Sequence, residues 1–209
     1  MIKKLLIKAR LVMVVCAFAA FPAQAADDNG QEILQKGLDA FERADIMGAL
    51  PHLNQAAEMG YPEAQTLLAH IMARGEENEI AQKWYLKAAE QGYANAQFAL
   101  AELAIEGKPG VTLTSAEGLE WLEKAVEQTH PVATNFLASL LETGRLGVKV
   151  DIQRASALYH HAAEAGVGDA MVRLIQAYKS GELSLQADPV KSAIWQQKLD
   201  DVKKAAQGK

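Results

Sequence analysis

The chain of 209 residues contains a single cysteine, Cys16, and aromatic residues make up only 6% of it. One cysteine cannot form an intramolecular disulfide, so packing alone has to stabilise the fold. Aromatic and β-branched residues favour strands, and their scarcity beside abundant alanine argues against an all-β sandwich. Hydrophobic residues make up 50% of the sequence and charged residues 22%, a balance that excludes general disorder.

The sequence also lacks an excess of basic residues and a long apolar run. Its formal net charge of −5 at pH 7 argues against a nucleic-acid binder, because phosphate contacts need a basic surface. No apolar segment reaches the ~18–20 residues that are needed to cross a bilayer. We therefore expect no nucleic-acid partner.

Residues 1–25 have the pattern of a secretory signal peptide. A basic start precedes an uncharged, mostly apolar stretch at 11–21, and Pro22 ends that stretch. Ala23-Gln24-Ala25 then supplies the small residues that signal peptidase requires. An uncleaved membrane anchor is disfavoured because the apolar stretch is too short. The pattern predicts cleavage after Ala25 and a periplasmic protein, with secretion left open and no stable membrane insertion once the signal is removed.

Cleavage at this point would also change the composition of the mature chain. It removes four basic residues, which takes the net charge from −5 to −9, and it removes Cys16. An oxidising compartment would then add no disulfide to the fold.

The remaining chain repeats one pattern of small and apolar residues. An alanine is followed eleven residues later by a glycine in four copies, at Ala64–Gly75, Ala96–Gly107, Ala133–Gly144 and Ala170–Gly181. A leucine four residues after each alanine lies on the same face of a helix. Glycine is a typical stop at a helix C-terminus. Each copy is therefore expected to begin with a helix that the glycine ends.

A loop and a second helix follow each glycine. Thr114, Asp151 and Asp188 come seven residues after their glycines and are good N-caps, whereas the second copy shortens this step to two residues, at Glu77. Seven residues past these starts, one face of the second helix carries Trp84, Trp121, Leu158 and Trp195. The fixed register of the three tryptophans assigns them to the core.

A more divergent copy precedes these four and makes five helix pairs in all. Its residues Gly37, Ala49, Leu53 and Ala56 align by the 32-residue step with the second copy. A single pair cannot bury its apolar face, whereas stacked pairs share a continuous core. The sequence therefore predicts an all-α solenoid of antiparallel helix pairs, with repeats at about 30–61, 62–93, 94–130, 131–167 and 168–204.

Residues 83–97, with the sequence KWYLKAAEQGYANAQ, resemble the signature of the Sel-one-like repeat (SLR) family. Residues 144–151 and 155–166 are similar to the inter-helix loop and second helix of the same repeat. That family is a subclass of the tetratricopeptide-repeat superfamily. The resemblance implies a curved right-handed superhelix that binds proteins or peptides on its concave face. Exported bacterial members are often adaptors, so the resemblance implies a periplasmic interaction adaptor or scaffold.

The resemblance also implies that the first helix of each pair lines the concave surface. Exposed inner positions then fall two, six and nine residues after the opening alanine, and Asn95 directly precedes its alanine. Apolar groups among polar neighbours suit the capture of a peptide, although a solvated groove or self-association would use the same pattern. The candidate partner-binding residues are Thr66, His70, Asn95, Phe98, Glu102, Ile105, Asn135, Ser139, Glu142, Val172, Gln176 and Lys179.

No local motif in the sequence is typical of an enzyme or cofactor site. It contains no phosphate-binding loop, no HExxH and no GxSxG or SxxK pattern. His160 and His161 are adjacent, so on a helix their side chains point about 100° apart, which is poor for chelation. We therefore expect no catalytic residue, no cofactor and no metal.

Two alternatives stay open at this stage. Some exported members of the resembled family have been linked to β-lactam binding, which suggests an envelope enzyme or a cell-wall-ligand binding protein. Those members carry cysteine pairs within each repeat, and this chain has none after residue 16. The other alternative is a structural subunit of a larger envelope assembly.

Overall fold

The computed structural model describes residues 28–207, where the regular elements are ten α-helices and one short 3-10 helix. In chain order they are α1 (Asp28–Glu42), α2 (Ile46–Glu58), α3 (Pro62–Arg74), α4 (Asn78–Glu90), α5 (Ala94–Glu106), α6 (Ser115–Glu127), α7 (Pro131–Thr143), η1 (Arg145–Gly147), α8 (Ile152–Glu164), α9 (Gly168–Ser180) and α10 (Pro189–Gln207). Consecutive helices pack into five pairs, from α1 with α2 to α9 with α10. The prediction of an all-α solenoid of five helix pairs is confirmed.

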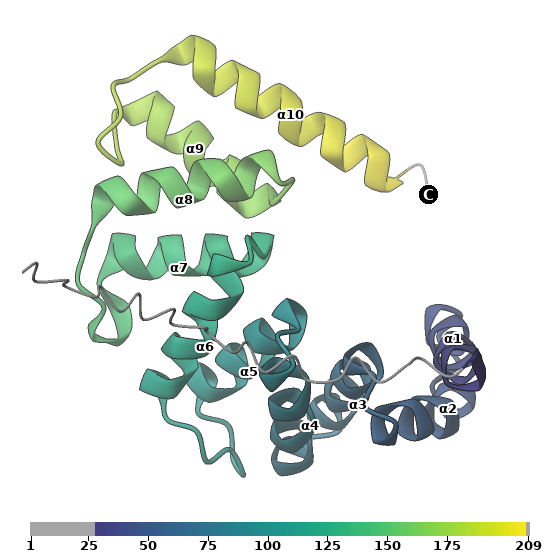
Figure 1. Ribbon diagram of the computed structural model, residues 1–209. Helices are drawn as coiled ribbons and strands as arrows, with labels where there is room; N and C mark the ends of the chain where they lie inside the picture. The colour runs from purple at the N-terminus through teal and green to yellow at the C-terminus, as the bar shows by residue number, and fades with distance from the viewer. Residues whose placement is uncertain (1–27, 208–209) are drawn as a thin grey trace, which may run out of the picture.

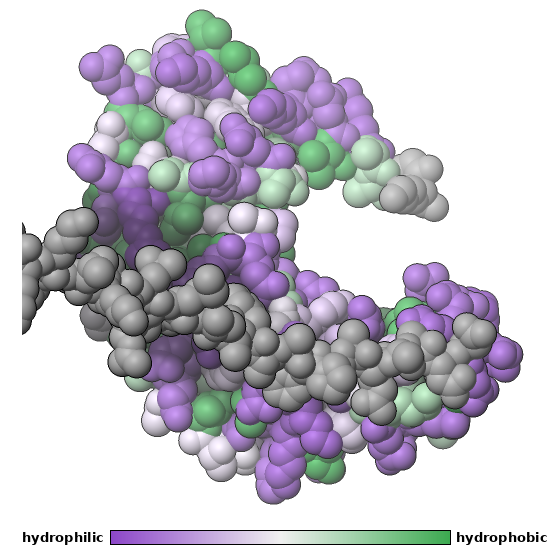
Figure 2. Space-filling view, viewed as in Figure 1, coloured by the Kyte–Doolittle hydropathy of each residue, from purple (hydrophilic) through white to green (hydrophobic). Residues whose placement is uncertain are grey.

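The five pairs curve into an open C (Figure 1). In this view α1 and α3 lie toward the opening and α2 and α4 lie on the outer side, while α10 faces α1 across the gap. The surface seen from the same side is mostly hydrophilic, with separate hydrophobic patches (Figure 2). Within residues 28–207, none of the helices is both long enough and apolar enough to span a membrane. The predicted signal peptide at 1–25 lies outside the described residues.

The predicted N-caps begin the second helices of the last three pairs. The Thr114 hydroxyl accepts from the Glu117 amide at 3.2 Å, and the Glu117 carboxylate accepts from the Thr114 amide at 2.7 Å, which is a capping box. Asp151 accepts from the Arg154 amide at 2.9 Å, and Asp188 accepts from the Lys191 amide at 3.0 Å. These side chains accept hydrogen bonds from backbone amides in the first turn, which have no partner inside the helix.

Three of the four predicted glycine stops adopt the left-handed conformation. Gly107, Gly144 and Gly181 have φ values of 61°, 70° and 76°. Gly75 differs, with φ −85°, and the next residue, Glu76, takes the left-handed conformation at φ 64°. The chain between α3 and α4 is the shortened loop, so it reverses within one turn and its left-handed residue comes one position later.

Small residues allow the two helices of each pair to cross closely. A Cβ atom on Gly118 would lie 3.2 Å from the Ala101 carbonyl oxygen, which shows how near α6 passes to α5. In the last pair the larger Ile175 takes the position of Ala101, and Ser192 stands opposite in the position of Gly118. The Ser192 hydroxyl donates to the Ile175 carbonyl at 3.2 Å, so the close crossing is kept there too.

The tryptophans lie at the edge of the core rather than at its centre. Trp195 is buried, with 7% of its surface exposed, but Trp84 and Trp121 are only half-buried. In each case the lysine three residues further on covers the ring, with Nζ at 4.0 Å from the centroid of Trp84, 3.6 Å from Trp121 and 4.2 Å from Trp195. The prediction of core positions is right for Trp195. The rings of Trp84 and Trp121 pack at the edge of the core, and cation–π contacts with lysine cover their outer faces.

Buried glutamines tie each of the first two pairs to the next. The Gln65 amide donates to the Ala57 carbonyl at 3.0 Å, and its Oε1 accepts from Gln91 at 2.8 Å. The next junction repeats the arrangement, because Gln97 donates to Ala89 at 3.2 Å and accepts from Gln128 at 2.7 Å. Ala57 and Ala89 lie in the last turns of α2 and α4, where carbonyl groups have no partner inside the helix.

Candidate interaction surface

All the predicted partner-binding residues lie on the first helices of their pairs, α3, α5, α7 and α9, and none is fully buried. The exposed ones are His70, Asn95, Glu102, Val172, Gln176 and Lys179. The half-buried ones are Thr66, Phe98, Ile105, Asn135, Ser139 and Glu142. We call these twelve residues the first-helix surface. Several of them already have partners inside the protein, which separates them into engaged and free groups.

Phe98 and Asn95 are engaged by His130, the N-cap of α7. The His130 Nδ1 accepts from the Ala133 amide at 3.1 Å, so its Nε2 carries the proton and donates to Asn95 Oδ1 at 3.0 Å. The imidazole stacks on Phe98 with centroids 5.1 Å apart, and Phe136 meets Phe98 edge-on at 6.4 Å. Burial lowers the pKa of His130, which favours the neutral ring that this bonding requires. Part of the Phe98 ring is therefore a contact between repeats.

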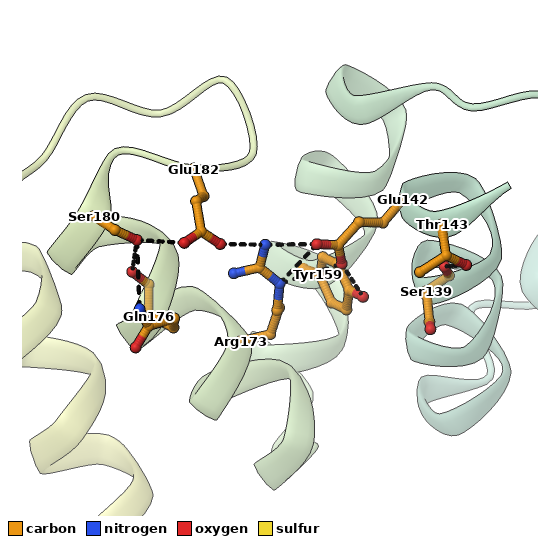
Figure 3. Close-up of polar contacts among 8 residues, drawn as sticks. All are labelled: Ser139, Glu142, Thr143, Tyr159, Arg173, Gln176, Ser180 and Glu182. Atoms are coloured by element: carbon orange, nitrogen blue, oxygen red, sulfur yellow. Dashed lines mark hydrogen bonds and ion pairs between the residues drawn. The ribbon is translucent and has the colours of Figure 1, made fainter.

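Glu142 is the centre of a polar network on α7, α8 and α9 (Figure 3). Arg173 Nε donates to Glu142 Oε1 at 3.0 Å, and Arg173 Nη2 pairs with both Glu142 and Glu182, the latter at 2.8 Å. The Tyr159 hydroxyl donates to Glu142 Oε2 at 2.8 Å. The Ser180 hydroxyl donates to Glu182 at 2.6 Å and extends the network to the end of α9.

The network perturbs the acidity of its members. Burial alone would raise the pKa of Glu142, but the hydrogen bonds from Arg173 and Tyr159 and the charge of Arg173 outweigh it, so the pKa is lowered. Burial, with the hydrogen bond to Glu142 and its charge, raises the pKa of Tyr159. Both shifts keep Glu142 charged and Tyr159 protonated at neutral pH, so the network joins two repeats through charge-assisted hydrogen bonds.

Neither Arg173 nor Tyr159 was predicted as a partner of Glu142. Arg173 lies three residues after its opening alanine, where the other copies carry Leu67, Ala99 and Phe136. A charged residue at an otherwise apolar register position was therefore a signal that sequence reasoning missed. The 31-residue separation of Arg173 from Glu142 hides the pairing itself.

Glu102 and Val172 belong to the free group. Within the described residues Glu102 makes no hydrogen bond or ion pair, because the nearby Lys108 binds Glu106 at 2.9 Å. Burial and then the charge of Glu106 raise the pKa of Glu102, and burial together with the Glu102 charge raises that of Tyr85 to about 12. Val172 on α9 is an apolar side chain with 53% of its surface exposed. An unpaired carboxylate and an uncovered apolar group are therefore presented two repeats apart.

Asn135 adds an unsatisfied polar atom between them. Its Oδ1 is buried and has no hydrogen-bond partner, on the helix α7 that lies between α5 and α9 in the stack. Buried amide oxygens are normally paired, so this atom is an exception within the fold. Among the described residues there is no group of three or more His, Cys, Asp or Glu side chains that could hold a metal ion. The side chains of this surface can bind by contact, charge and hydrogen bonding.

Stacked antiparallel helix pairs with a shared core define a repeat solenoid, a class whose units contact only their neighbours and expose extended surfaces. A family model described as Sel1 repeat matches residues 62–93, 94–130 and 131–167, which is about half of the chain. The chain therefore belongs to the Sel1 repeat family. Proteins of this family are generally non-catalytic scaffolds for protein–protein interaction.

Similar proteins come from several organisms. A solved Sel1 repeat protein of Oxalobacter formigenes is 34% identical, with a TM-score of 0.66 over 73% of this chain and 45% of that one. The SLR protein c5321, described as a protective antigen of uropathogenic Escherichia coli, is 24% identical with a TM-score of 0.67, over 82% of this chain and 38% of that one. The similarity to c5321 concerns the fold alone.

Among curated proteins, "Chitin synthase regulatory factor 3" of Schizosaccharomyces pombe is 27% identical over 161 residues. The match covers 73% of this chain but 17% of the fission yeast protein. The chain thus spans a small part of this relative and less than half of the two solved structures.

Proposed function

We propose that the chain is a periplasmic scaffold that binds a segment of a partner protein along its first-helix surface. The observation that carries the proposal is that Glu102 and Val172 are presented on this surface without partners inside the described chain. Exposed apolar groups among polar neighbours are typical of protein interaction sites. The Sel1 repeat fold supports the same class of function.

The engaged group gives this surface its rigidity. Glu142 is held by Arg173 and Tyr159, and Phe98 is held by His130, so α5, α7 and α9 are fixed relative to one another. A partner segment would then meet a pre-organised surface, which lowers the entropy lost on binding. The periplasmic location is supported by the signal-peptide pattern at residues 1–25.

The test places a photo-crosslinking amino acid at position 172 in the full chain, expressed in cells. We expect one dominant crosslinked partner, and we expect Glu102→Lys on the same chain to remove that adduct while the Tm stays unchanged. Both side chains are exposed, so neither change is expected to disturb the packing. The matched control carries the crosslinker at Gln153, an exposed position on the second helix α8. The same adducts from both positions would refute a specific surface.

A further inference from the structure

The junctions between successive repeats are closed by a recurring set of large side chains. At the first junction these are Gln65, Trp84 and Gln91, and at the second they are Gln97, Trp121 and Gln128. The two glutamines of each set bond to one another, and each tryptophan packs against both of the core clusters that meet there. The indole ring and the hydrogen-bonded pair of glutamines together fill the space where the repeats meet.

The third junction has a smaller residue at every one of these positions. Thr134 takes the place of the first glutamine, Leu158 that of the tryptophan and Ala165 that of the second glutamine. The space is left open as a groove of about 320 Å³ between α6, α7 and α8. Its lining is mostly apolar and includes Val126 and Pro131 besides these three residues.

The fourth junction shows that the groove is a local feature. There the equivalent positions carry Met171, Trp195 and Val202, and both Met171 and Trp195 are buried. A large apolar set replaces the glutamine pair and closes the junction. Of the four junctions, the third is the one at which all three of these positions carry smaller side chains.

Backbone strain accompanies the open groove. Thr129 lines it with φ 58°, in the left-handed region, whereas the same position in the other repeats is glycine: Gly60, Gly92 and Gly166, with φ values of 97°, 86° and 92°. A β-branched residue is strained in this conformation. Strained residues of this kind gather at binding sites, because the surrounding structure has to hold them.

We propose that the groove at the third junction binds a tryptophan side chain of a partner protein. The argument is complementarity: the chain fills the equivalent space of its other junctions with its own Trp84, Trp121 and Trp195, so the walls of this space suit an indole ring. A volume of about 320 Å³ fits one such side chain and lies near the lower end of small-ligand pockets. His161 lines the groove at the register position of Lys87 and Lys124, the residues that cover the tryptophans elsewhere.

The groove is distinct from the first-helix surface, because none of its lining residues belongs to that set. The proposal therefore does not depend on the function proposed above. Either site can fail its test without affecting the other.

The experiment titrates the isotope-labelled full chain with the peptide acetyl-Gly-Gly-Trp-Gly-Gly-amide, followed by amide NMR shifts. We expect saturable shifts at Thr129, Thr134 and Ala165, with affinity about tenfold above that of the same peptide carrying leucine. Free indole is the third probe. Shifts elsewhere, or equal affinity for the leucine peptide, would overturn the proposal. Tighter binding of free indole than of the peptide would point to a small aromatic ligand and would overturn it as well.

Two variants complete the test. Leu158→Trp restores the tryptophan of the repeat pattern, so it should fill the groove and reduce peptide affinity about tenfold or more while the Tm is kept or raised. The double change Thr134→Gln with Ala165→Gln rebuilds the hydrogen-bonded pair of glutamines and gives a second way to close the groove if the first variant does not fold. Full affinity in a folded, closed variant would contradict the proposal. Ala157→Trp, at an exposed position on α8 that does not line the groove, is the matched control, and it should bind the peptide as the unchanged chain does.

Discussion

Arg173 on α9 binds both carboxylate oxygens of Glu142 on α7 and thereby joins the fourth and fifth repeats. The pair is largely shielded, with 21% and 20% of the two side chains exposed, and Glu182 and Tyr159 complete it. Such a bridge resists screening by salt better than a surface pair does. Its contribution to stability depends on pH, because the pKa of Glu142 is lowered in the folded protein.

Glu142→Gln should lower the free energy of unfolding by about 1–3 kcal/mol at pH 7, because it leaves Arg173 half-buried with a weaker partner. The folded-state pKa of Glu142 is lowered, so its stabilisation is present above the unfolded pKa of about 4.3 and is lost as the pH falls through the folded value. The difference in Tm between the two proteins, measured from pH 7 to pH 3, should shrink in the acidic range. A gap that stays constant with pH would contradict the assignment. Glu32→Gln, in an exposed pair with Lys36, is the control with little expected effect.

Thr129→Gly should stabilise the array. Glycine adopts a φ of 58° without the strain of a β-branched side chain, and this gain exceeds its entropy cost by about 0.5–1 kcal/mol. Urea unfolding followed by circular dichroism measures the change. The reverse substitution at the equivalent site, Gly166→Thr, should be destabilising, because φ there is 92°. If both changes moved the midpoint in the same direction, the strain argument would be wrong.

Ala138→Trp should loosen the α7–α8 packing. Ala138 is fully buried, with 0% exposure, and a larger side chain there forces the helices apart at a cost of about 1–3 kcal/mol or more. Ala157→Trp is the matched control, since Ala157 is exposed on α8. An unfolding midpoint equal for the two variants would show that position 138 is not a packed crossing.

Gln97→Leu should weaken the second junction. The change removes the hydrogen bonds of Gln97 to the Ala89 carbonyl and the Gln128 amide, at a cost of about 0.5–1.5 kcal/mol for each bond. Hydrogen exchange of the α4 and α5 amides should quicken more than exchange in α9, because units of a solenoid are coupled to their neighbours. Uniform acceleration along the chain would argue against a local role. Gln153→Leu, at an exposed site, is the control.

Export can be tested on the intact protein. Residues 1–25 predict cleavage after Ala25, so the mature chain should begin at Ala26 and be released with the periplasmic fraction. Intact-mass measurement of protein purified from that fraction gives the N-terminus directly. Retention of residues 1–25 in exported protein would refute the prediction.

Much of the fold could be predicted because a solenoid is built from local units. The spacing from Ala133 to Gly144 marks a helix and its left-handed stop, and Asp151 marks the start of the next helix. Leu137, four residues after Ala133, is buried as its helical register requires. Each of these signals acts within one or two helical turns, and each repeat packs against its neighbours, so the same short pattern is repeated along the chain.

The sequence by itself determined the class of fold, the five pairs and the residues of the first-helix surface that escape full burial. Only the tertiary structure decided which of those residues are engaged, because Glu142 meets Arg173 across 31 residues and Phe98 meets His130 from the next repeat. The groove beside Leu158 depends in the same way on Thr134 of α7, Leu158 of α8 and Ala165 at the end of α8 all being shorter than their counterparts. Register fixes the face on which a side chain lies, but its neighbours across a junction are set by how the stacked repeats are offset, which no single repeat encodes.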